Sequence, residues 1–207
     1  MHKESLLYSI LTRFGDYYPL KLKNDVGNLI EDLNRNFEWV QYNPRKNINR
    51  EGLSITSLDG GMSGKPDLDS LYEHYFETGI ALGEADFNTK TPVYSYFKDW
   101  LDPLESYLGR THVIRLNNGG YFPPHRDNKN TSIHSFRLFL PLNYDRDTTF
   151  FMLENNKMEF ENGVMYFIDT AKMHTLFNAS QNPFYFVVAN IILTDESIDK
   201  TISFLKG

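Results

Sequence analysis

The sequence has no cysteine among its 207 residues, and this absence removes several chemistries at once. A disulfide framework, a thiolate nucleophile, an iron–sulfur cluster and a zinc site with sulfur ligands all need cysteine. Any bound metal must therefore use histidine, aspartate or glutamate side chains. The chain has six histidines, so each can be considered individually.

Two further absences concern partners. No run approaches the roughly 20 apolar residues of a membrane span, and the amino-terminal residues lack the apolar core of a signal peptide. We therefore expect a soluble, cytoplasmic protein without a membrane partner. The net charge is −6 and no basic run is present, which argues against nucleic-acid binding. The negative charge is concentrated in residues 51–108, which hold 3 Lys/Arg against 11 Asp/Glu.

Apolar and aromatic residues are plentiful. Hydrophobic residues make up 41% and aromatic residues 15% of the chain, which is typical of a globular protein with a packed core and not of a disordered chain. At this length we expect one domain over residues 1–207.

The pattern of apolar residues divides the chain into three parts. Residues 1–108 are expected to be a mainly helical flanking segment, with a break at Tyr-Tyr-Pro (17–19), two short extended runs (37–42 and 53–58) and helices over 68–82 and 92–108. Residues 109–194 hold short aromatic and β-branched runs separated by Gly, Asn, Asp and Pro, at 113–116, 136–142, 148–153, 158–160, 164–168, 173–177 and 184–193. Residues 195–207 are predicted to form a final helix capped by Asp195 or Thr194. The fold class is therefore mainly β, a sandwich or jelly roll with flanking helices.

Metal chemistry is indicated inside the β part of the chain. His125 and Asp127 are two positions apart, so an extended strand directs both side chains to one face, where they can hold one ion. A second histidine, His174, follows the predicted strand 164–168. Two histidines and one carboxylate are the ligands of a facial site that leaves coordination positions open, a set typical of non-haem Fe(II) oxygenases.

Four segments in this order carry a specific resemblance: residues 120–127 (GYFPPHRD), 136–142 (FRLFLPL), 161–170 (ENGVMYFIDT) and 174–180 (HTLFNAS). Together they resemble the aspartyl/asparaginyl β-hydroxylase-like group of 2-oxoglutarate oxygenases, which is also similar to bacterial proline hydroxylases. The resemblance implies a double-stranded β-helix, Fe(II) held by His125, Asp127 and His174, and 2-oxoglutarate and O₂ as co-substrates. It also implies hydroxylation of a free amino acid or of an amino-acid side chain in a peptide or protein.

The chain departs from this family at one position. The arginine that usually grips the far carboxylate of 2-oxoglutarate is replaced by Phe184, and the predicted strand 184–193 contains no cation. A dicarboxylate in an apolar barrel needs such a partner. Arg137 is our first candidate for this role and Arg115 the second, although Arg137 could instead bind the near carboxylate or the substrate, and Arg115 could pair with a surface acid.

Three other residues are candidates for roles near the site. Asn178 could orient a ligand or the co-substrate, or it could cap the turn after its strand. Tyr121 and Trp100 are expected to cover the substrate pocket.

The loss of the usual arginine at Phe184 also keeps an alternative function open, a non-catalytic metal-binding β-barrel that retains the oxygenase fold.

Overall fold

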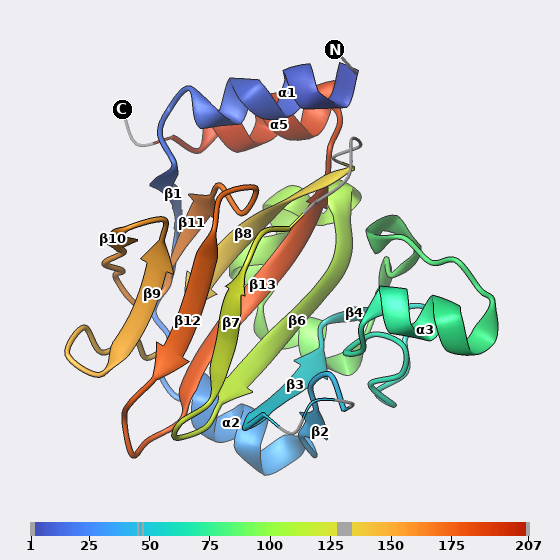
Figure 1. Cartoon of the computed structure of the whole chain (residues 1–207), viewed down its shortest axis with the longest axis vertical. Coiled ribbons are helices and arrows are strands. Elements are labelled where there is room, and N and C mark those ends of the chain that lie inside the picture. The colour runs from blue at the N-terminus through green and yellow to red at the C-terminus, as the bar shows by residue number, and fades with distance from the viewer. Residues whose placement is uncertain (1–2, 45, 47, 128–133, 206–207) are drawn as a thin grey trace.

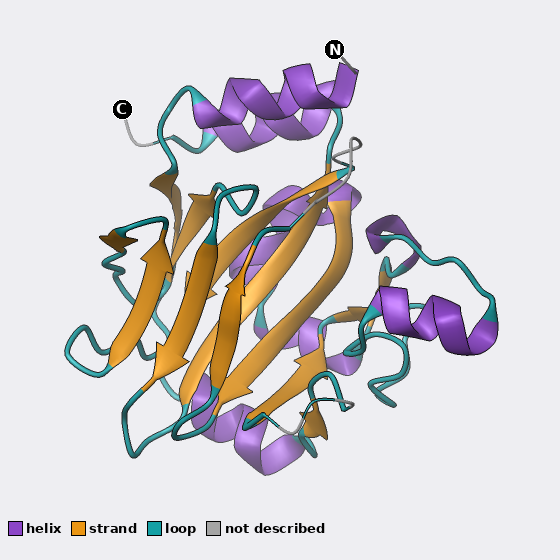
Figure 2. Cartoon of the chain, in the orientation of Figure 1, coloured by secondary structure: helices purple, strands orange, loops and turns teal. Residues whose placement is uncertain are grey.

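A computed structural model describes residues 3–44, 46, 48–127 and 134–205. Two antiparallel sheets face each other, and helices lie at the ends and on the outer side of the larger sheet (Figures 1 and 2). In sheet order, the large sheet contains β1 (Tyr17–Lys23), β11 (Val164–Ile168), β8 (Ser135–Pro141), β13 (Phe184–Ile192), β6 (Leu108–Leu116), β3 (Arg50–Ser54) and β2 (Val40–Gln41). The small sheet contains β10 (Asn156–Lys157), β9 (Thr149–Leu153), β12 (His174–Asn178) and β7 (Tyr121–His125). This arrangement confirms the expected double-stranded β-helix.

Short elements complete the chain. A separate pair of strands, β4 (Thr56–Ser57) and β5 (Thr89–Lys90), lies beside β3 and β6. The helices are α1 (Lys3–Thr12), α2 (Leu29–Asn36), α3 (Leu71–Thr78), α4 (Lys98–Leu101) and α5 (Asp195–Ser203), with 3₁₀ helices η1 (Glu84–Asp86), η2 (Pro92–Tyr96) and η3 (Asp102–Tyr107). None of the helices in the described part of the chain has the length and apolar character needed to cross a membrane.

The central strands are buried on both faces, which explains their continuous apolar sequences. Nearly all residues of β6 and β13 are buried, so these strands show no clean alternation of apolar and polar residues. Their outward side chains join α1, α2, α4 and α5 in one hydrophobic cluster, while their inward side chains meet the small sheet in a second.

The first and last helices, α1 and α5, pack together on one side of the barrel. Helices α1 and α5 lie side by side in Figure 1. Thr194 caps α5 by accepting a hydrogen bond from the Ser197 backbone N–H, which is one of the two caps expected.

The first part of the chain contributes more strand than its sequence predicts. The expected break at residues 17–19 lies inside β1, whose Tyr18, Leu20 and Leu22 are buried. Proline is tolerated there because β1 is an edge strand of the large sheet. The expected extended runs correspond to β2, β3 and β4, and β1, β2 and β3 all join the large sheet.

Two other expectations differ in detail. The helix expected over residues 92–108 is one turn of α-helix, α4, between the 3₁₀ segments η2 and η3, because Pro92 begins η2 and Pro103 lies in the first turn of η3. The strand expected at 158–160 is absent; β10 instead precedes it at Asn156–Lys157 and pairs with β9.

Candidate metal centre

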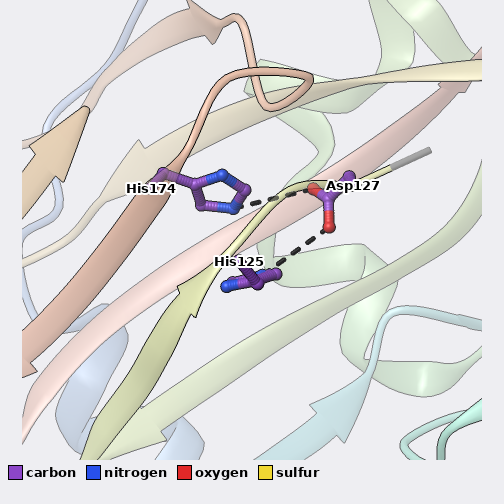
Figure 3. A group of neighbouring side chains, drawn as sticks. All are labelled: His125, Asp127 and His174. Carbon is purple, nitrogen blue, oxygen red and sulfur yellow. Dashed lines mark ion pairs between the residues drawn. The ribbon is translucent and has the colours of Figure 1, made fainter. Parts of the chain in front are cut away.

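His125, Asp127 and His174 lie together where two strands of the small sheet meet. His125 ends β7, His174 begins β12, and the two residues are directly paired across the sheet. Asp127 follows β7 and its backbone N–H donates to the Thr170 carbonyl at 2.9 Å, which fixes it beside the other two. One potential ligand atom from each residue lies within 4.8 Å of the others. Figure 3 shows both histidine rings beside the Asp127 carboxylate.

The histidine rings are oriented for metal binding. His125 Nδ1 lies 2.7 Å from the Pro123 carbonyl oxygen, and His174 Nδ1 lies 3.0 Å from that of Lys172. A carbonyl oxygen can only accept, so each neutral ring carries its proton on Nδ1 and leaves the Nε2 lone pair free. Both Nε2 atoms face Asp127, at 3.6 Å from Oδ1 and 3.7 Å from Oδ2. Burial lowers the pKa of His174, which favours the neutral, metal-binding form.

Asp127 supplies a charged ligand. Burial alone would raise its pKa, but Arg137, His174 and His125 together outweigh burial and hold the pKa below its ordinary value. Its Oδ2 atom is buried and accepts no directional hydrogen bond from the described residues, although Arg137 Nη1 forms an ion pair with it at 2.5 Å. A carboxylate oxygen has two lone pairs, so the ion pair with Arg137 still leaves one available for a metal cation.

Arg137 is the predicted anchor that the structure brings to this centre. It lies on β8, and its Nε donates to Asn190 Oδ1 at 3.1 Å. Asn190 is fully buried and its Nδ2 is held by the Arg110 carbonyl at 2.5 Å. The guanidinium is therefore fixed in a position beside the metal ligands.

Arg115 and Asn178 are not brought to the centre. Arg115 alternates with Ile114 on β6 and so faces away from the barrel, where it pairs with Glu51 at 2.7 Å and lies over the Trp39 ring. Asn178 is fully buried, but its side chain bonds the backbone of Leu116, Asn182 and Ser180 and holds the turn between β12 and β13.

The two aromatic residues expected to cover the pocket lie elsewhere. Trp100 is buried in the outer cluster, where its Nε1 donates to the Gly163 carbonyl at 2.8 Å. Tyr121 is 43% exposed, because alternation on β7 turns Phe122 inward and Tyr121 outward.

A cavity of about 360 Å³ opens beside the three ligands. Much of its wall is apolar and comes from both sheets, including Ile114, Phe139, Phe151, Leu176 and Phe186. Its polar lining includes the three ligands and the side chains of Arg50, Arg110, His112 and Arg137.

Arg50 and His112 were not identified as site residues from the sequence. His112 is 3% exposed, lines the cavity and has a buried Nδ1 without a partner in the described part of the chain. Burial, reinforced by the charges of Arg110 and Arg137, holds its pKa well below the usual value, so its ring is neutral. The spacing in the sequence could have placed His112 on the inner face, because His112, Ile114 and Leu116 are alternate residues of one strand and share that face.

A family model described as aspartyl/asparaginyl β-hydroxylase matches residues 96–191, slightly less than half of the chain. This match confirms the resemblance seen in the sequence motifs. No curated protein matches the chain by sequence.

Solved structures with low sequence identity share the fold. An oxidoreductase of the 2OG-Fe(II) oxygenase family from Burkholderia pseudomallei is 13% identical, with a TM-score of 0.51 over 94% of this chain and 92% of its own. A prolyl-4-hydroxylase from Pseudomonas putida is 9% identical, with a TM-score of 0.50 over 92% of this chain and 98% of its own. The non-haem α-ketoglutarate-dependent epimerase SnoN from nogalamycin biosynthesis is 10% identical, with a TM-score of 0.50 over 91% of this chain and 83% of its own. The last example shows that this fold accommodates more than one reaction, so the choice among reactions must come from the site.

Proposed function

We propose that this protein is an Fe(II)- and 2-oxoglutarate-dependent dioxygenase that hydroxylates an amino acid or an amino-acid side chain in a peptide or protein. The observation that carries the proposal is the cluster of His125, Asp127 and His174 beside a cavity inside a double-stranded β-helix. The matched hydroxylase family model supports the reaction class.

The donor set fits Fe(II). Two neutral imidazole nitrogens and one carboxylate form the facial arrangement that leaves positions open for other ligands. When bound, iron supplies the activation of O₂ together with the oxidative decarboxylation of 2-oxoglutarate. The carbonyl groups of Pro123 and Lys172 keep the histidine rings oriented, which is the usual task of groups behind metal ligands.

The rest of the site positions its ligands and keeps water away. Arg137 presents a fixed positive charge beside the metal ligands, where it suits the carboxylate at the chelating end of a 2-oxo acid. The aromatic and aliphatic wall contributed by both sheets limits the entry of water next to the reacting carbon.

The size of the cavity favours a small target. A volume of about 360 Å³ is near the lower end of ligand pockets, and it must hold both the co-substrate and the group to be hydroxylated. A free amino acid or one side chain of a peptide, with the remainder outside the cavity, satisfies this limit.

The test is an anaerobic titration of the protein with Fe(II) and then 2-oxoglutarate, followed by the metal-to-ligand charge-transfer absorption of a chelated 2-oxo acid. We expect the band in the wild type, and we expect iron binding to be largely lost in His174→Ala. His74→Ala, which changes a histidine on α3 away from the centre, is the matched control and should behave as the wild type.

Two outcomes would refute the proposal. A wild type that does not bind iron has no metal centre of this kind. A wild type that binds iron but never shows the band is not a 2-oxoglutarate enzyme, and this second result would favour the non-catalytic metal-binding module.

A further inference from the structure

Arg50 is a buried cation that no described residue neutralises. It begins β3, is 3% exposed and lines the same cavity as the proposed metal ligands. Its guanidinium carbon lies 4.2 Å from the centroid of the Phe122 ring and 5.4 Å from that of Tyr42. Its Nε atom is buried without a hydrogen-bond partner in the described segments, and no carboxylate of those segments forms an ion pair with it.

The neighbouring arginines differ from Arg50 because each has an acidic partner. Arg110 is held by both carboxylate oxygens of Glu84 at 2.8 and 2.9 Å, Arg115 pairs with Glu51, and Arg137 pairs with Asp127. Burial lowers the pKa of Arg50, but a guanidinium stays protonated in proteins, so Arg50 remains a charge. Burying an uncompensated charge costs more free energy than the cation–π contacts with the two aromatic rings return. A ligand in the cavity can supply the missing anion.

A second polar group lies near Arg50. The register of β3 and β6 places His112 opposite Ser54, four positions from Arg50, but its ring centroid is 5.2 Å from that of Tyr42, which also contacts Arg50. The buried His112 Nδ1 is likewise without a partner in the described residues. A neutral histidine and an arginine on two paired strands can donate hydrogen bonds to one carboxylate.

The strand that usually carries the far anchor has no cation to offer. Phe184 on β13 is buried in an aromatic cluster, 5.1 Å from Phe186 and 6.2 Å from Tyr144 between ring centroids. Arg137 is committed to Asp127 at the metal centre. A dicarboxylate whose chelating end lies at the metal and Arg137 therefore needs a second cation for its other end.

We propose that Arg50, assisted by His112, binds the far carboxylate of the 2-oxo acid. This assignment rests on the proposed function and gives the co-substrate an anchor on β3, outside the core strands of the barrel. The aromatic rings of Tyr42 and Phe122 contact the guanidinium, and the side chain lines the cavity that the co-substrate would enter.

The experiment compares two 2-oxo acids that differ only at the far end, 2-oxoglutarate and 2-oxopentanoate. Affinity is measured by anaerobic titration of the Fe(II)-loaded protein through the charge-transfer band, and by calorimetry on the Mn(II)-loaded protein. The wild type should prefer 2-oxoglutarate. Arg50→Met should lose about 10- to 100-fold in affinity for 2-oxoglutarate, as expected for a charge-assisted pair, while its affinity for 2-oxopentanoate stays unchanged.

The controls separate this role from a structural one. Arg115→Met removes an arginine from the neighbouring strand that faces away from the cavity, and it should keep the wild-type preference. Arg50→Lys keeps the charge without the planar fork and should retain part of the preference.

The possible failures are distinguishable. An Arg50→Met protein that still prefers 2-oxoglutarate as the wild type does, or that weakens both acids equally, would overturn the assignment and leave the proposed function intact. Absence of the charge-transfer band in the iron-loaded wild type would overturn the proposed function and the assignment with it.

Discussion

The two faces of the seven-stranded sheet are built from the same strands and differ in what they bury. On the outer face, Phe136, Val187 and Ala189 pack with the helices in a continuous apolar cluster. On the inner face, the same strands carry Arg137 and Phe186 toward the small sheet and the cavity. Alternation along a strand therefore separates a face devoted to stability from one that also carries charges and open hydrogen-bonding groups.

The comparison indicates where substitutions should act. A substitution on the outer face should change the stability of the fold, whereas substitution of the unpaired Arg50 on the inner face should change ligand binding and leave stability equal or higher. Functional sites commonly carry such unsatisfied groups at a cost to stability.

The largest effect is expected on the outer face. Phe167 on β11 is fully buried and stacks on Tyr18 at 4.8 Å between ring centroids. Phe167→Ala should lower the free energy of unfolding by about 3–5 kcal/mol, measured by urea denaturation. Phe177→Ala on the small sheet is the control, since Phe177 is 41% exposed, and it should cost much less. Equal losses in the two variants would contradict the view that burial in the outer cluster makes Phe167 important for stability.

A smaller change of opposite sign is expected on the inner face. In the protein without ligands, Arg50→Met should leave the free energy of unfolding unchanged or raise it by about 1 kcal/mol, because the substitution removes an unpaired buried charge. Thermal and urea denaturation without metal or oxo acid measure this difference. A loss greater than about 1 kcal/mol would mean that the contacts with Phe122 and Tyr42 stabilise the fold and explain the residue without a ligand.

The smallest effect is expected for the arginine on the neighbouring strand. Arg115 and Glu51 are both partly exposed, so Arg115→Met should cost about 0.5 kcal/mol or less, with little dependence on metal or oxo acid. Urea denaturation of the wild type and Arg115→Met in low and high salt measures this difference in the free energy of unfolding. If Arg115→Met weakened oxo-acid binding instead, the outward direction of its side chain would be wrong.

Much of the β fold could be predicted from the sequence, because its strands are short aromatic and β-branched runs between clear turn residues. The run at residues 164–168 matches β11 in full, and α5 begins after the expected Thr194 cap. The prediction failed at β1, where Pro19 suggested a break, because nothing local in a sequence shows that a strand lies at the edge of a sheet.

The metal centre could be predicted from motif spacing, but the place of Arg50 in the cavity could not. His125 and Asp127 are neighbours in sequence, and a family pattern identified His174. Arg50 reaches the cavity only because β3 pairs with β6 across 58 to 66 positions of sequence, from Ser54↔His112 to Arg50↔Leu116. Such long-range pairing leaves no local pattern, so Arg50 could be found only in the three-dimensional structure.

The pairing of β3 with β6 also limits which fragments of the chain can fold by themselves. Residues 96–191 include every proposed metal ligand but not β3, which covers one side of β6 along most of its length. Without β3, the backbone N–H and C=O groups on that side of a long, strongly apolar strand would be exposed as an open edge. Open edges of this kind pair with other chains, so the apparently minimal catalytic segment would tend to aggregate in isolation.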